Sequence, residues 1–204
     1  MAAQAGATTI EHIFEDTDGK LDELLREMRK RGSIWVPTLA TAETLAPQLF
    51  AAHKVAVKTA FDRGVRLAAG GDTGTFDHGL NAREMEIMIE VGIPVEDVLE
   101  ASTVAGWEAC GGDQCGFRFG WFEKGNRADI IALDTDPRKD KKALRKVNFV
   151  MKDGEVWKQN GVATGMVKST QWPSSSDDEE GSSSSEEWTE LNSHQQPVLT
   201  IKLD

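Results

Sequence analysis

The sequence has few cysteines, and the two present define neither a zinc site nor a disulfide framework. Cys110 and Cys115 are the only cysteines among 204 residues, and no histidine lies near them in the sequence. A structural zinc site needs four ligands, drawn from several cysteines and histidines at characteristic spacings. We therefore expect two reduced thiols, which are usual in a reducing compartment.

Long apolar runs are also missing. No window reaches the roughly 18 apolar residues that a membrane-spanning helix requires. The N-terminus does not combine a basic start with an apolar segment, as a secretory signal would. These absences exclude a membrane as a partner and, together with the reduced thiols, predict a soluble, cytoplasmic protein.

A concentrated positive charge is absent as well. The net charge is −11, and residues 169–190 contain seven acidic residues with no lysine or arginine. The rest of the chain therefore carries a net charge of −4. Because phosphate binding needs a clustered cationic face, nucleic acid is excluded as the main partner.

What the sequence does contain, from residue 9 to about residue 110, is an alternation of short β-like runs and helical stripes. This pattern is typical of βα units that build a parallel sheet, and it predicts an α/β fold. The first expected strand ends at His12, and the next two cover residues 33–37 and 65–69.

The predicted helices begin with recognisable signals. The first carries apolar residues on one face, with Asp18 as its N-cap and Gly32 just beyond its end. A second covers residues 48–63. A third begins at Asn81, and Glu84 three residues later suggests a capping box. The residues expected inside this third helix and at the opening of the fourth are Met85, Met88, Ile89, Pro94, Glu96 and Asp97.

The pattern changes after Gly111. Residues 128–133 and 147–151 read as strands, and residues 152–155 as a hairpin turn, which predicts a small antiparallel unit. The serine-rich acidic sequence beyond residue 165 cannot bury enough apolar surface to offset its chain entropy. We therefore expect three regions: 1–110, an α/β unit; 111–165, a β unit; and 166–204, a disordered tail.

Asp72 is the main candidate for chemistry. It follows the third predicted strand, and a carboxylate at the C-terminal end of a barrel strand points into the mouth where such folds place their active sites. An aspartate that caps the following turn explains the same residues. Asp72-Thr73-Gly74 also matches an aspartic-protease signature, but that mechanism needs a second such loop, which the sequence lacks.

Three histidines have two readings each. His12 lies at the same strand end as Asp72, so it is either a metal ligand or a hydrogen-bonded structural histidine. His78, in the loop before the third helix, either contacts substrate or lies near the helix start. His53 falls on the apolar stripe of the second helix, which favours a core or subunit-contact role.

Six segments, in this order, resemble the amidohydrolase superfamily, in particular its imidazolonepropionase-like and Xaa-Pro dipeptidase-like branch. The resemblance covers residues 2 to about 158. The segments are Ala5-Gly6-Ala7-Thr8-Thr9-Ile10-Glu11-His12, Val36-Pro37-Thr38-Leu39, Ala69-Gly70-Gly71-Asp72-Thr73-Gly74 with His78-Gly79, Asn81-Ala82-Arg83-Glu84, residues 124–130 and residues 149–154.

This resemblance implies the C-terminal part of a (β/α)8 TIM-like barrel, holding strands six to eight, with part of a small β-sandwich. It implies that His12 binds a divalent metal, with Zn²⁺ expected. Asp72 would bind the metal and act as the catalytic proton shuttle, and His78 is the candidate for substrate binding. The family hydrolyses amide, cyclic amide or dipeptide C–N bonds with metal-activated water.

The resemblance also implies that part of the active site is missing. The family's metal ligands on strands one, four and five would precede Met1, so we expect an incomplete C-terminal half that is inactive alone. The alternative is a non-catalytic remnant that serves as an interaction module. The expected partners are a small-molecule amide or peptide substrate, and either a second copy of the chain or a complementing N-terminal half.

Overall fold

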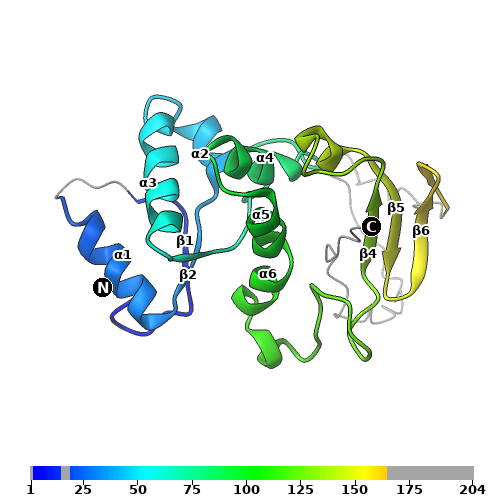
Figure 1. Ribbon diagram of the computed structural model, residues 1–204, viewed down its shortest axis with the longest axis horizontal. Helices are drawn as coiled ribbons and strands as arrows, with labels where there is room; N and C mark the ends of the chain where they lie inside the picture. Colours follow the sequence, from blue (N-terminus) through cyan, green and yellow to red (C-terminus); the bar gives the residue numbers. More distant parts are fainter. Residues whose placement is uncertain (1, 15–18, 165–204) are drawn as a thin grey trace, which may run out of the picture.

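The computed structural model describes residues 2–14 and 19–164 (Figure 1). The elements of its first part are β1 (Thr9–Glu11), α1 (Leu21–Arg31), β2 (Ile34–Val36), α2 (Leu39–Leu45), α3 (Phe50–Asp62), β3 (Arg66–Leu67), α4 (Ala82–Glu90), α5 (Val95–Ser102) and α6 (Val104–Ala109). Those of its second part are the short 3₁₀ helices η1 (Gly112–Cys115) and η2 (Lys141–Arg145) and the strands β4 (Ile130–Leu133), β5 (Val147–Lys152), β6 (Glu155–Gln159) and β7 (Val162–Ala163). Within the described residues, no helix is both long and apolar enough to cross a membrane.

The first part is built on a parallel sheet in the order β1-β2-β3. Ile10 pairs with Trp35, and Trp35 pairs with Leu67 on its other side. The three predicted parallel strands are therefore confirmed, and with them the α/β fold class. Because the strands are parallel, the residues that follow each of them lie at the same edge of the sheet.

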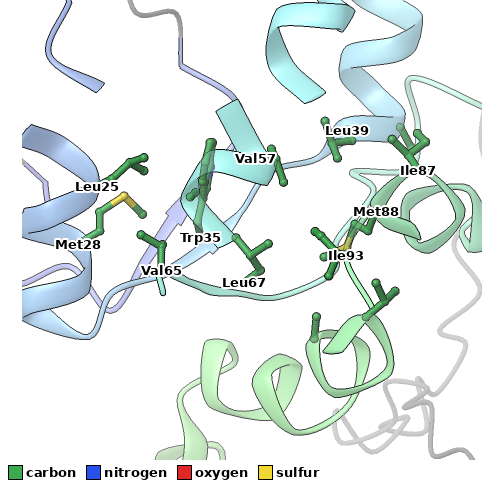
Figure 2. Packing of buried hydrophobic residues seen from close by; sticks show 14 of the residues in the cluster. Leu25, Met28, Trp35, Leu39, Val57, Val65, Leu67, Ile87, Met88 and Ile93 are labelled. Atoms are coloured by element: carbon green, nitrogen blue, oxygen red, sulfur yellow. The ribbon is translucent and has the colours of Figure 1, made fainter. Parts of the chain in front are cut away.

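One face of the sheet is covered by α1 and α3. Trp35 is fully buried among Leu25 and Met28 of α1 and Val57 of α3, as Figure 2 shows. Successive side chains of a strand point to opposite faces, so the neighbours of Trp35 point away from these helices. A buried tryptophan at the centre of such a layer is worth about 3–5 kcal/mol relative to alanine.

The opposite face of the sheet packs against α6. Ile34 and Val36 of β2 form a small buried cluster with Ala68 and with Ala105 of α6. The small alanine side chains allow the helix to approach the sheet closely. An ion pair between Arg66 at β3 and Glu108 of α6 adds a polar contact.

Helix ends follow the sequence signals in part. Gly32 closes α1 with φ of 70°, which confirms its predicted place. The predicted cap Asp18 lies outside the described residues. The capping box at Asn81 and Glu84 is wrong: the side chain of Asn81 makes no cap hydrogen bond, and Glu84 bonds a different helix. The short helix α2 was not predicted at all.

The second part is an antiparallel sheet in the order β4-β5-β6-β7. Its predicted hairpin is confirmed: Lys152 pairs with Glu155 across a two-residue turn. Asp153 and Gly154 both have positive φ, at 51° and 83°, as the tight turn favoured between twisted strands requires. The last strand, β7, was not predicted.

Ion pairs join the two parts. Arg145 of η2 donates two hydrogen bonds to Glu86 of α4, and Lys141 of η2 pairs with Glu90 of the same helix. Figure 1 shows α4, α5 and α6 between the parallel sheet and the antiparallel one. The barrel, the second layer of a sandwich and the three domain boundaries stay predictions, and the predicted tail lies outside the described residues.

Candidate active site

The carboxyl ends of the three parallel strands carry backbone strain. His12 directly follows β1, Thr38 follows β2 and Asp72 lies in the loop after β3, and their φ angles are 66°, 52° and 56°. Residues other than glycine seldom adopt this left-handed conformation, and for a β-branched threonine it is an outlier. Strain of this kind persists where surrounding contacts enforce it, often at functional sites.

His12 is held by its main chain and by its ring. Its N–H donates to the carbonyl of Val36 at 2.9 Å, and its own carbonyl accepts from Trp35 Nε1 at 2.8 Å. The Trp35 ring in turn stacks on Phe14, with centroids 4.6 Å apart. The Nδ1 atom of His12 lies 3.2 Å from Thr38 Oγ1. A histidine that engages one ring nitrogen in this way can offer the other to a metal ion.

Asp72 is held through the first turn of α2. The hydroxyl of Thr41 lies 2.7 Å from the carbonyl oxygen of Gly71, 3.1 Å from that of Asp72 and 2.6 Å from the hydroxyl of Thr75. These contacts fix the main chain of the loop rather than the carboxylate, and the Asp72 residue is exposed. The side chain is thus presented from an anchored backbone.

The glycines before Asp72 are required by packing. A Cβ on Gly70 would lie 2.8 Å from Cγ1 of Val36, and one on Gly71 would lie 3.0 Å from Cζ of Phe76. Contacts that short force the neighbours to move. Gly70 therefore lets the loop pass close to β2, and Gly71 leaves room for the Phe76 ring of the same loop.

His78 is exposed in the loop before α4. Among the hydrogen bonds of the described residues, none joins His78 to His12 or Asp72. Its role in substrate binding stays a prediction. His53 is buried, at 7% exposure on α3, in keeping with the core position that its apolar stripe indicated.

Glu84 is the residue that sequence reasoning misassigned. Only 1% exposed, its carboxylate accepts the N–H of Leu39 at 3.0 Å and that of Ala40 at 2.7 Å. Burial raises the pKa of Glu84 to about 7, while the hydrogen bonds from Ala40 and Leu39 oppose the rise. The carboxylate thus caps the start of α2 from another helix, a contact that no local spacing could reveal.

The donor atoms of His12 and Asp72 are of the kinds that zinc prefers, imidazole nitrogen and carboxylate oxygen. The part of the chain that the structure describes contains no group of three or more histidine, cysteine, aspartate or glutamate side chains able to hold an ion. Catalytic zinc sites use three protein ligands. His12 and Asp72 therefore fit a metal as part of a donor set, with further donors required from elsewhere.

A largely apolar cavity of about 930 Å³ lies beside this edge. Gly70 and Gly71 form part of one wall, and Ile131 and Val150 of the antiparallel sheet form part of another. Its lining includes neither His12 nor Asp72. The cavity therefore adjoins the strand ends without containing the candidate catalytic groups.

Parallel α/β sheets commonly bind their ligands at the carboxyl ends of the strands, where His12, Thr38 and Asp72 lie. The sequence matches the Amidohydrolase family over residues 1–167. The chain belongs to this family, which confirms the resemblance that its motifs carry.

Two relatives extend the match. Ochratoxinase from Aspergillus niger is 28% identical over 182 residues, covering 79% of this chain and 36% of the relative. A crystal structure of a Xaa-Pro dipeptidase with methionine bound in its active site is 27% identical, with a TM-score of 0.68, over 77% of this chain and 41% of that one. The family and these relatives support hydrolysis as the general type of reaction.

A third likeness concerns the fold alone. An adenosine deaminase from Xanthomonas campestris with bound zinc is 20% identical, with a TM-score of 0.52, over 78% of this chain and 38% of that one. In each of the three comparisons the chain spans well under half of its relative's length.

Proposed function

We propose that this chain supplies the C-terminal part of a metal-dependent amidohydrolase that hydrolyses an amide, cyclic amide or dipeptide C–N bond. The observation that supports this proposal is that His12, Thr38 and Asp72, all in left-handed conformation, follow three adjacent parallel strands on the same side of the sheet. The 27% identity to a Xaa-Pro dipeptidase supports a substrate of this class.

In this proposal His12 binds a divalent ion, Zn²⁺ being expected, through the ring nitrogen opposite its Thr38 contact. Asp72 contributes a carboxylate oxygen to the same ion. When bound, such an ion lowers the pKa of a water molecule toward neutrality. Asp72 accepts the proton of the attacking water and returns it to the leaving nitrogen, and His78 contacts the substrate.

The partners follow from the same proposal. The substrate is a small-molecule amide or peptide, and neither nucleic acid nor a membrane is a partner. The other metal ligands come from a complementing N-terminal part, with self-association of two copies as the alternative. A cytoplasmic location is supported by the two free thiols, Cys110 and Cys115.

The decisive experiment is a chimera in which residues 2–164 replace the matching segment of the Xaa-Pro dipeptidase. We expect zinc-dependent hydrolysis by the chimera when it is assayed on Xaa-Pro dipeptides, N-acyl amino acids and cyclic amides. The chain alone should hydrolyse none of them. Asp72→Asn should lower the rate on the order of 10²–10⁴-fold, because it removes the proton acceptor.

The matched control is Asp77→Asn, another exposed aspartate of the same loop. This variant should retain the activity of the parent chimera. A folded, zinc-loaded chimera that keeps full activity with Asn at position 72 would remove Asp72 from the reaction. A folded chimera without any activity would favour a non-catalytic interaction module.

A further inference from the structure

Glu84 is a buried acid without an obvious local purpose. It lies in the first turn of α4, its residue is 1% exposed, and its two carboxylate oxygens accept one main-chain N–H each, from Leu39 and Ala40. Burying a carboxylate is costly, and a neutral cap would stabilise a short helix at lower cost. The cost of burying this carboxyl group therefore suggests that Glu84 has a role beyond stabilising the helix.

The reason lies in Thr38, the residue at the N-cap position of α2. A threonine at this position normally accepts a hydrogen bond from its own helix. Thr38 makes no such bond, because its φ is 52° and its hydroxyl lies 3.2 Å from His12 Nδ1. The first N–H groups of α2 are instead satisfied by Glu84.

The same first turn contacts the other candidate ligand. Thr41 lies one turn after Thr38, and its hydroxyl contacts the carbonyl oxygens of Gly71 and Asp72. The start of α2 thus contacts His12 through one threonine and the Asp72 loop through another. Fixing the position of this turn fixes both contacts.

We propose that Glu84 is a positioning residue: by capping α2 in place of Thr38, it sets the relative placement of His12 and Asp72. Its importance for catalysis rests on the function proposed above for these two residues. The length of the side chain matters, since it reaches from α4 to the first turn of the neighbouring helix α2. The presence of two oxygens matters because two adjacent N–H groups need acceptors.

The test uses the full chain and the variant Glu84→Gln, which keeps the shape but offers a single acceptor oxygen. We expect a folded protein in which the Leu39 and Ala40 amides exchange about 10-fold faster, as after loss of a hydrogen bond. The Nδ1 resonance of His12 should shift in the direction produced by Thr38→Val, which removes the hydroxyl directly.

The control is Glu86→Gln, on the same helix, whose carboxylate bonds Arg145 instead. It should change neither the two amides nor the His12 ring. If Glu84→Gln does not fold, the same measurements are made on Glu84→Asp, because this variant keeps the carboxyl group but withdraws its oxygens by one methylene. A folded Glu84 variant with unchanged His12 resonances, or an equal response to Glu86→Gln, would overturn the proposal.

These measurements need neither metal nor substrate, so they remain decisive if the chimera proves inactive. If the chimera is active, Glu84→Gln should lower kcat by up to about 10-fold, with KM little changed. This is the low end of the range of about 10–100-fold for losing a direct contact to a metal ligand, because Glu84 acts through Thr38 and Thr41. Loss of the hydrolytic function with an intact His12 response would leave Glu84 as a positioning residue for a site of another kind.

Discussion

At the scale of single residues, the conformation of Thr38 lowers the stability of the fold but brings its hydroxyl to His12. Its left-handed conformation costs on the order of 1–3 kcal/mol, yet its hydroxyl contacts His12. Thr38→Gly removes the strain and the contact together, so we expect the free energy of unfolding to change by no more than about 1 kcal/mol.

The matched variant Thr38→Val keeps the strain and loses the contact. It should be less stable than Thr38→Gly by about 1–2 kcal/mol. Urea denaturation of the two variants and the parent measures both values. Equal stability of the two variants would show that the backbone at residue 38 is not under strain.

Glu84 predicts an unusual pH dependence. Its pKa is raised from 4.5 to about 7, so the folded chain keeps a proton that the unfolded chain has released. The stability that comes from keeping Glu84 protonated in the folded chain is therefore fully present below about pH 4.5. It is lost as the pH rises through about 7. The difference corresponds to about 3 kcal/mol.

The measurement is the free energy of unfolding of the parent and of Glu84→Gln between pH 4.5 and 8. As the pH rises, the free energy of unfolding of the parent should fall relative to that of Glu84→Gln. Glu86 has the opposite sign, because the hydrogen bond from Arg145 lowers its pKa and its contribution is lost as the pH falls. A difference that is constant across this range would mean that Glu84 does not titrate there.

At the scale of elements, the path of the loop after β3 depends on Gly70. A Cβ there would lie 2.8 Å from Cγ1 of Val36, and this clash predicts that Gly70→Ala costs about 1–3 kcal/mol. Adding Val36→Ala should recover part of this loss, since it removes the clashing methyl. Gly106→Ala serves as the control, because its Cβ would lie 3.8 Å from the nearest carbonyl oxygen and alanine favours a helix.

Thermal and urea unfolding of Gly70→Ala, Val36→Ala and the double variant measure the coupling free energy between residues 70 and 36. Simple additivity of Gly70→Ala and Val36→Ala would show that the two positions do not interact.

The elements that could be predicted from the sequence are those specified by neighbouring residues. The parallel strands follow from short apolar runs, the end of α1 from Gly32, and the β5–β6 turn from Asp153-Gly154. Helix α2 could not be predicted, because it is short and its cap, Glu84, comes 45 residues after Leu39. The spacing of Asn81 and Glu84 matches a capping box, but the carboxylate of Glu84 bonds the distant helix α2 instead of its own helix.

The candidate site could likewise be predicted from the sequence only in part. Asp72 and His12 could be placed at one sheet edge, because parallel strands bring their carboxyl ends together. The contacts that orient them could not be read, since Thr38 and Thr41 reach them from 26 and 31 residues away. Their roles in binding a metal stay predictions.

At the scale of the whole molecule, the parallel sheet is open. Among the described residues, the outer edges of β1 and β3 have no neighbouring strand, and Val55 of α3 and Leu45 of α2 are each 66% exposed. Unpaired edges and exposed apolar side chains favour association. We expect the purified chain to self-associate, and a complementing N-terminal part to return it to a defined complex.

Sedimentation velocity over a dilution series measures this directly. A monomer that persists on concentration, with the same thermal stability in the presence and absence of the complementing part, would contradict the expectation.

The left-handed strand ends also affect how this sequence can change over generations. Glycine would relax the left-handed backbone at residues 12, 38 and 72, but at residues 12 and 38 it would also remove the contact between the two side chains, so selection for stability alone favours glycine chiefly at residue 72. Hydrolysis by the complemented enzyme would impose the opposite selection, because it would need the side chains of His12 and Asp72. In a library sorted by resistance to proteolysis, glycine should be enriched at residue 72, and in one sorted by hydrolysis of the complemented enzyme it should be lost there.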